Sequence, residues 1–285
     1  MRFVLAAWLL LLTFSGSTLA EPQKPVSTSE QFRDEFKSVP CINSEREAAV
    51  RALFRKMGAS RAAIIPQTYL KAENLLVRKP GTEEGLIIVG AHYDKVPLGC
   101  GAFDNWTGVV TVAHLYRSLK STLLKKTILF VAFGNEEQGA FGSRGMANAL
   151  EAAGLANYCA MINIDSLGLI GPQVMDNTSS ESLRALAEEV ANNLKIPFAH
   201  ARIEGGDADS SSFLRKQIPS VTIHGMTEDW PTILHSPNDR AAAVKPESVY
   251  LGYRLALALV TRLDNMPCDA SRSPGRDLRS PADAH

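Results

Sequence analysis

The sequence has no excess of charge of either sign, because 30 lysines and arginines balance 30 aspartates and glutamates. No basic stripe and no acidic block appears anywhere along it. Proteins that hold nucleic acid by its phosphates carry a basic surface of that kind. The composition therefore argues against nucleic acid as a partner and leaves the choice of partner to the motifs.

Long apolar runs are missing beyond the first twenty residues. Met1 and Arg2 give a short positive start, residues 3–14 are almost wholly apolar, and Ala20 is a small residue at the end. This pattern predicts a secretory signal peptide over residues 1–20, cleaved after Ala20. The alternative is an uncleaved anchor, but the apolar run is shorter than the roughly 20 residues of a membrane span. We expect an exported protein, periplasmic or extracellular, with no stable membrane insertion after cleavage.

Cysteine is scarce, and none of the four residues forms a C-x-x-C pair: Cys41, Cys100, Cys159 and Cys268. This spacing argues against a zinc cluster built of cysteines, whereas export permits disulfides. Four cysteines allow three complete pairings, and the sequence does not choose among them. A bond between Cys41 and Cys268 would join the two ends of the domain, and we keep it as a guess for one pair.

No internal repeat divides the chain, and strand and helix patterns alternate along most of it. Residues 21–40 are polar, with several prolines and serines, and predict a flexible N-terminal arm. Residues 267–285 are rich in serine, proline, arginine and aspartate and predict a disordered tail. The alternation over residues 41–266 predicts an α/β fold, a single domain in which helices sandwich a mostly parallel mixed sheet.

Individual elements follow from the apolar patterns. Continuous apolar runs, typical of strands covered on both faces, lie at 85–90, 127–133, 158–164 and 220–224. Two further patterns, 62–69 and 74–78, predict an outer hairpin. Helical spacing predicts helices over 104–119, 138–152, 180–194 and 247–263, and one that begins at Ser44 with Glu47 completing a capping box.

The most informative feature is that acidic residues and histidines repeatedly follow apolar runs. Five segments share it: His92-Tyr93-Asp94, Gly101-Ala102-Phe103-Asp104-Asn105, Asn135-Glu136-Glu137, Asn163-Ile164-Asp165 and Leu234-His235-Ser236. Three of them directly follow predicted parallel strands, whose carboxyl ends meet at one edge of the sheet. Burying such groups is costly unless a metal or a partner satisfies them. Two histidines with several carboxylates suit two zinc ions.

Each segment taken alone has a simpler interpretation. Alternation along an extended chain would let Asp94 accept a hydrogen bond from His92, but a solvated turn explains the pair equally well. Asp104 is favoured as a helix N-cap, and Glu136 with Glu137 suits the start of a helix. The five segments together favour the metal site over these separate explanations.

The ordered set of motifs closely resembles the co-catalytic zinc aminopeptidases of metallopeptidase family twenty-eight, whose fold glutaminyl cyclases share. The resemblance runs from Asn74 to Leu263 and implies the zinc-dependent exopeptidase (phosphorylase/hydrolase-like) fold, two zinc ions per chain and peptide substrates. It also implies individual roles. Asp104 would bridge the ions, His92 and Asp165 would complete one site, and Glu137 and His235 the other. Glu136 would be the general base and Asp94 would orient His92.

Residues that flank the motifs are candidates for the substrate pocket: Cys100, Phe103, Asn105, Trp106, Met226 and Trp230. Ordinary packing explains each of them equally well. The leading hypothesis is a secreted, monomeric aminopeptidase that removes N-terminal residues from peptides. The alternative is a glutaminyl-peptide cyclase, although Asn105 after Asp104 favours the peptidase. A zinc carboxypeptidase or dipeptidase would need an inserted lid domain for which this chain has no room.

Overall fold

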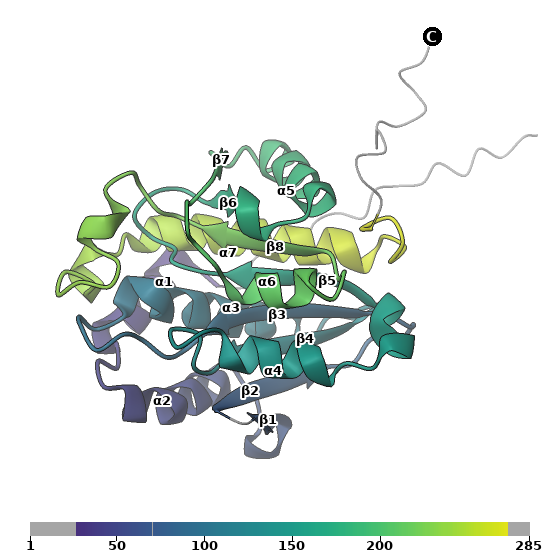
Figure 1. Ribbon diagram of the computed structural model, residues 1–285, viewed down its shortest axis with the longest axis horizontal. Coiled ribbons are helices and arrows are strands. Elements are labelled where there is room, and N and C mark those ends of the chain that lie inside the picture. The colour runs from purple at the N-terminus through teal and green to yellow at the C-terminus, as the bar shows by residue number, and fades with distance from the viewer. Residues whose placement is uncertain (1–26, 70, 273–285) are drawn as a thin grey trace, which may run out of the picture.

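An eight-stranded mixed sheet, with helices on both faces, forms the single domain of the computed structural model, which describes residues 27–69 and 71–272 (Figure 1). The strand order is β1-β2-β4-β3-β5-β8-β6-β7. The strands are β1 (Ile64–Tyr69), β2 (Ala72–Lys79), β3 (Leu86–His92), β4 (Thr127–Phe133), β5 (Tyr158–Ile164), β6 (Gln173–Met175), β7 (Ala199–Ala201) and β8 (Ser220–His224). The central strands β4, β3, β5 and β8 are mutually parallel, and the flanking pairings are partly antiparallel. The predicted fold class is confirmed.

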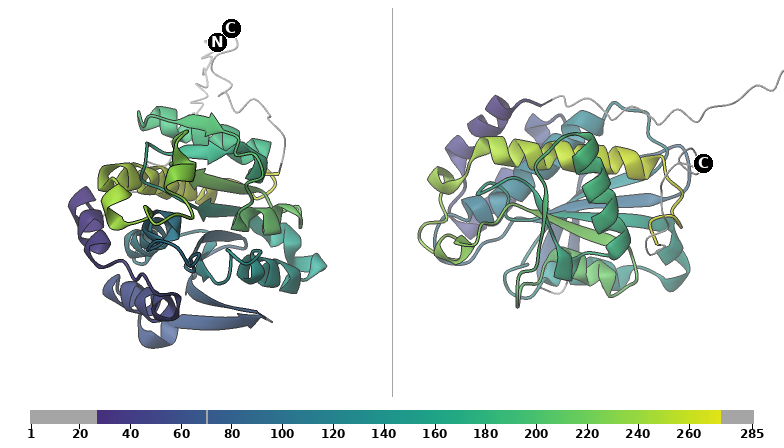
Figure 2. Two further views of the ribbon diagram at one scale, coloured as in Figure 1. Left: turned by 60° about the vertical axis from the view of Figure 1, so that its left-hand side comes forward. Right: turned by 90° about the horizontal axis from the view of Figure 1, so that it is seen from above.

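One face of the sheet is covered by more helices than the other. The helices are α1 (Ser29–Glu35), α2 (Asn43–Lys56), α3 (Thr107–Leu119), α4 (Phe141–Ala149), α5 (Glu181–Asn193), α6 (Asp209–Leu214) and α7 (Pro246–Asp264). Figure 2 shows the helices on either side of the sheet. The larger core lies beneath α2, α3 and α7, while a smaller cluster, with Phe133, Met146 and Phe213 in it, lies beneath α4 and α6. Every residue of β4 is buried, as a strand covered on both faces requires.

Several element boundaries differ from the sequence prediction. The first long helix begins at Asn43 and its N-cap, Ile42, makes no side-chain cap, so the expected capping box of Ser44 and Glu47 is wrong. The helix expected from residue 104 begins at Thr107, because residues 102–106 form a separate tight turn. The strands β6 and β7 and the helix α6 were not predicted, since elements of three to six residues leave little periodicity to recognise.

The expected flexible arm is wrong for the described residues 27–40. Thr28 and Gln31 form a complete capping box at the start of α1. Phe32 is fully buried and stacks on the ring of His114 with 4.3 Å between ring centres, and Phe36 is also buried. Two aromatic residues one helical turn apart thus fasten this segment to the core. The predicted signal peptide, residues 1–20, lies outside the described residues.

The cysteines pair as Cys41–Cys100 and Cys159–Cys268, so the guessed bond between Cys41 and Cys268 is wrong. Cys100 follows the carboxyl end of β3, whereas Cys159 lies at the amino end of β5, which is parallel to it. Strands of seven residues separate these ends by roughly 20 Å. Cys41 lies with Cys100 at one end and Cys268 with Cys159 at the other, so the two are much farther apart than a disulfide spans.

The expected disordered tail is likewise wrong for residues 267–272. Cys268 is bonded to Cys159, and Ser271 is buried and donates its hydroxyl hydrogen bond to backbone carbonyls of Cys159 and Cys268. Residues 273–285 lie outside the described part of the chain. Among the described helices, none is both long and apolar enough to cross a membrane.

Because Phe32 fixes α1 to the core, replacing Phe32 by alanine should lower the free energy of unfolding by about 3–5 kcal/mol. Urea denaturation of the purified chain measures this. Leu123→Ala is the matched control, since the Leu123 side chain is 84% exposed, and its effect should stay within about 0.5 kcal/mol. A cost at Phe32 as small as the control's would contradict the docking of α1.

Candidate metal centre

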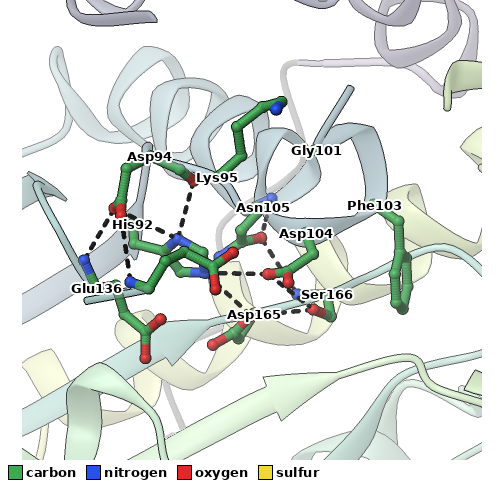
Figure 3. Close-up of polar contacts among 12 residues, drawn as sticks. His92, Asp94, Lys95, Gly101, Phe103, Asp104, Asn105, Glu136, Asp165 and Ser166 are labelled. Atoms are coloured by element: carbon green, nitrogen blue, oxygen red, sulfur yellow. Dashed lines mark hydrogen bonds and ion pairs between the residues drawn. The ribbon is translucent and has the colours of Figure 1, made fainter. Parts of the chain in front are cut away.

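The carboxyl ends of three neighbouring parallel strands bring charged side chains together. His92 is the last residue of β3, Asp165 follows β5, and Glu136 and Glu137 lie in the loop after β4. Figure 3 shows His92, Asp104 and Asp165 pointing toward one another, with Glu136 beside them, at the edge that the sequence pattern predicts. Two long loops supply Asp104 and His235 from outside the sheet.

Two groups of ligating atoms form at this edge and share one residue. His92, Asp104 and Asp165 make the first group, and Asp104, Glu137 and His235 make the second, with the ligating atoms of each group within 4.8 Å of one another. Asp104 Oδ1 lies 3.1 Å from His92 Nε2, and Asp104 Oδ2 lies 3.1 Å from His235 Nε2. The two oxygens of one carboxylate therefore face the two groups, which is the arrangement of a bridging ligand.

The turn that carries Asp104 is fixed by neighbours on every side. Gly101 begins it with a left-handed backbone (φ 58°), a conformation that suits glycine. The Asn105 side chain donates to the Ile164 carbonyl at 2.9 Å and accepts from the Gly108 and Ser166 amides. Asn105 thus ties the turn to the end of β5, next to Asp165.

Asp94 lies beside His92 and also contacts the loop after β4. Its carboxylate accepts hydrogen bonds from the backbone amides of Glu136, at 2.9 Å, and Glu137, at 3.2 Å (Figure 3). It lies 3.7 Å from His92 Nδ1, beyond hydrogen-bond distance, while the backbone carbonyl of Asp94 lies 3.2 Å from that nitrogen. A proton on Nδ1 bonded to this carbonyl leaves Nε2 free to bind a metal. The Asp94 carboxylate therefore lies between His92 and the backbone segment that carries Glu136 and Glu137.

The electrostatics of the cluster indicate a place for cations. Burial raises the pKa of Glu136 to about 9, with help from nearby carboxylates. Hydrogen bonds to Asp104 and Glu137 raise the pKa of His235 to about 10. Burial alone would lower the pKa of His92, but its bonds to Asp104 and Asp165 outweigh that and raise it. In this arrangement, protons partly offset the negative charge that metal ions would neutralise.

Glu137 provides a further test of whether a metal fits. Its side chain is only 7% exposed, and its Oε1 atom is buried without a hydrogen-bond partner, while Oε2 lies 3.0 Å from His235 Nε2. An unpartnered buried carboxylate oxygen is costly unless it ligates a cation. Imidazole nitrogens mixed with carboxylate oxygens suit zinc, so the residues present fit the ions that the sequence motifs imply.

A cavity of about 380 Å³ opens beside the cluster. The cluster residues and an outer wall line it, and the wall comprises Gly139, Ala140, Met175, residues 203–207, Met226, Trp230 and Leu234. Two predicted pocket residues, Met226 and Trp230, are in this wall. The other four, Cys100, Phe103, Asn105 and Trp106, do not line the cavity, because they lie in or beneath the Asp104 turn. For these four, packing is the better explanation.

Three residues around the site escaped the sequence analysis. Arg46 on α2 is fully buried, and its guanidinium donates to the carbonyls of Pro40, Tyr93, Cys100 and Gly101. Asp239 is 3% exposed and accepts from the amides of the Asp104 turn. Asp209 is fully buried with neither carboxylate oxygen hydrogen-bonded, and burial raises its pKa to about 7. Only Arg46 carried a sequence signal, since it continues the helical stripe of Val50 and Leu53.

Comparison with known proteins agrees with this geometry. Residues 74–260 match the model of Peptidase family M28. The chain belongs to this family. The match includes most of β2, every later strand to β8 and all five motif segments.

Relatives within the family include peptidases of different overall size. Aminopeptidase YwaD of Bacillus subtilis is 29% identical over 66% of this chain and 44% of its own length. The vacuolar membrane protease of Saccharomyces cerevisiae is 27% identical over 75% of this chain and 22% of its own length. This chain therefore spans less than half of either relative.

Solved structures share the fold. BSAP, a zinc aminopeptidase from Bacillus subtilis, aligns with a TM-score of 0.60 at 25% identity, over 66% of this chain and 49% of that one. The LapA aminopeptidase of Legionella pneumophila aligns with a TM-score of 0.69 at 18% identity, over 84% of this chain and 71% of that one. A glutaminyl cyclase from an Acidobacteriales bacterium aligns with a TM-score of 0.71 at 17% identity, over 89% and 99%.

The raised pKa values predict how stability depends on pH in protein stripped of metal. The His235 contribution is fully present below 6.5 and is lost as pH rises towards about 10, and the Glu136 contribution is present below 4.5 and lost through about 9. The free energy of unfolding should therefore fall between pH 7 and pH 9. Urea denaturation in the presence of a chelator measures it.

Two controls accompany this measurement. Glu136→Gln removes one of the titrating groups, so its stability should fall less steeply over the same range. Added zinc displaces protons from its ligands, so the stabilisation by zinc should grow from pH 7 to pH 9. A free energy that stays level or rises with pH in the metal-free protein would contradict the protonation of this cluster.

Proposed function

We propose that this protein is an exported di-zinc aminopeptidase that hydrolyses N-terminal residues from peptides. The observation that carries the proposal is the position of Asp104, whose two carboxylate oxygens each lie 3.1 Å from a histidine of a different ligand group. A bridging carboxylate between two His-and-acid groups suits a pair of ions more than a single one. His92 and Asp165 would hold one zinc, and Glu137 and His235 the other.

When bound, zinc would supply a Lewis acid at these residues, which would polarise a peptide carbonyl and make a water molecule more acidic. Glu136 does not belong to either ligand group, and it lines the cavity beside them. Its carboxylate is placed to take the proton of the attacking water and to pass it to the leaving amine. The backbone amide of Glu136 is held by Asp94, which fixes where that proton transfer takes place.

The cavity supports action at the end of a peptide. Its volume of about 380 Å³ is at the small end of ligand pockets and suits one residue with its side chain. Met226, Trp230 and Leu234 supply apolar wall, while Glu204 and Asp207 add two carboxylates to the lining. We propose peptides as substrates and a monomer as the working form, as the sequence analysis expects.

Export follows from the predicted signal peptide over residues 1–20, with cleavage after Ala20, and two disulfides support it. Disulfides persist in oxidising compartments, and both pairs close long loops, of 59 and 109 residues. Each would stabilise the fold by about 4–5 kcal/mol in the chain-entropy description. We therefore propose a periplasmic or extracellular location.

Replacing the proposed base tests the mechanism. Glu136→Gln should lower the turnover of aminoacyl-nitroanilides by roughly 10²–10⁴-fold, because an amide of nearly the same shape does not accept the proton. Zinc content, measured on the same sample by atomic emission, should stay at two ions per chain. Glu84→Gln, at an exposed position, is the control and should be unchanged. Full activity of Glu136→Gln would remove Glu136 from this role.

A glutaminyl-peptide cyclase is the second candidate, because this chain aligns with 99% of a solved cyclase, whereas it covers only 49% of BSAP. The two activities differ in product, since a cyclase converts an N-terminal glutamine to pyroglutamate with loss of ammonia and cleaves no peptide bond. Incubation with a glutaminyl peptide and a leucyl peptide separates them by mass spectrometry. We expect the free amino acid and the shortened peptide from both substrates, whereas formation of the pyroglutamyl peptide alone would favour the cyclase.

A further inference from the structure

Three buried aspartates in the described part of the chain bind backbone in the same way. Each carboxylate accepts hydrogen bonds from the amides of two consecutive residues. Asp94 accepts from Glu136 and Glu137 at 2.9 and 3.2 Å, Asp239 from Phe103 and Asp104 at 2.6 and 3.1 Å, and Asp264 from Lys126 and Lys125 at 2.7 and 3.2 Å. All three are less than 10% exposed.

The three differ in what the bound segment carries. Asp264 holds the residues just before β4, at the amino end of the parallel strands and away from the metal centre. Asp94 holds the segment with Glu137, and Asp239 holds the segment with Asp104. Asp94 and Asp239 therefore each accept a hydrogen bond from the backbone amide of a residue in the ligand groups.

Asp239 also joins the two loops that lie outside the sheet. Its backbone carbonyl accepts from the Cys100 amide at 2.7 Å, and its own amide donates to the Ser236 carbonyl at 3.2 Å. It follows His235 by four residues. The loop that carries Asp104 is therefore fastened, at Cys100 and again at Asp104, to the loop that carries His235.

We propose that Asp239 is a positioning residue for the metal centre, which sets the separation between Asp104 and His235 so that both ligand groups form. The inference rests on the proposed two-metal site and extends it to a residue that ligates neither ion. Asparagine at this position would keep one acceptor but turn an NH₂ group towards the second amide. One hydrogen bond would be lost, and the Asp104 turn would be free to shift.

The experiment compares Asp239→Asn with Asp264→Asn in the full chain. Both changes remove half of the same buried interaction, so both should lower the melting temperature of the metal-free protein. Only Asp239→Asn should weaken zinc binding, by about 10–100-fold at the weaker of the two sites, as loss of a residue that orients a ligand does. Competition with a chromophoric zinc chelator gives the affinity and the number of ions bound.

Asp239→Glu is the second variant, for the case in which Asp239→Asn does not fold. It keeps the charge and both acceptors but moves them by one methylene, so it should also weaken zinc binding relative to Asp264→Asn. Zinc affinities within twofold of the Asp264→Asn values in the folded Asp239 variants would overturn the inference while leaving the proposed function standing. A wild-type protein that binds no zinc would refute the metal centre itself, and this inference with it.

Discussion

The crowding of negative charge at one edge of the sheet is the constraint on which the structure of the site depends. Asp104, Glu137 and Asp165 meet within the two ligand groups, and Glu136 lies beside them. Carboxylates packed this closely in a buried setting repel one another, and the raised pKa of Glu136, to about 9, expresses that repulsion together with burial. Bound cations, whether protons or metal ions, offset this repulsion, so the geometry proposed to bind metal lowers the stability of the fold when no cation is bound.

The loops that hold these carboxylates accept backbone strain as well. Positive φ values occur at three residues of the site loops: 55° at Asn135, 52° at Ser166 and 56° at His235. His235 is itself a proposed ligand, and the other two are next to Glu136 and Asp165 in sequence. Left-handed backbone costs a non-glycine residue roughly 1–2 kcal/mol. Strain of this kind persists where the surroundings determine the chain path more strongly than local preference does. The anchors described above supply those surroundings, because Arg46, Asp94 and Asp239 each bind backbone atoms of the site loops.

The sequence was informative wherever one strong physical signal acted. Continuous apolar runs located the four central strands, and the residues that follow them located His92, Asp165 and the two glutamates, because the carboxyl ends of parallel strands necessarily share an edge. The same pattern of motifs included Asp104 and His235, which two loops carry into the site, and family resemblance implied their roles. Local reasoning failed where the partner was distant in sequence. Phe32 was read as part of an arm because nothing nearby shows that His114 would cover it.

The same limit explains why four of the predicted pocket residues do not line the cavity and why the guessed disulfide is wrong. Cys100, Asn105 and Trp106 stand next to Asp104 in sequence, and nearness along the chain was taken as nearness to substrate. A tight turn has one side that faces the cavity and one that faces the core. Asn105 and Trp106 are buried on the core side, where the centre of the Trp106 ring lies 5.3 Å from the guanidinium carbon of Arg46. Asp239, by contrast, lies 135 residues from Asp104, so no local pattern announces the contact.

The two disulfides divide the molecule in a way that follows from the sheet. Cys159–Cys268 fastens the amino end of β5 to the segment after α7, far from the site, and acts on the stability of the whole fold. Cys41–Cys100 instead joins the start of α2 to the residue before Gly101, where Arg46 binds the carbonyls of Cys100 and Gly101. A covalent bond, a buried guanidinium and the Asp239 carboxylate thus act on one short turn. In the proposed two-metal site, Asp104 would have to satisfy two ions at once and would tolerate displacement less than a ligand to one ion, which gives a physical reason for the concentration of anchors around it.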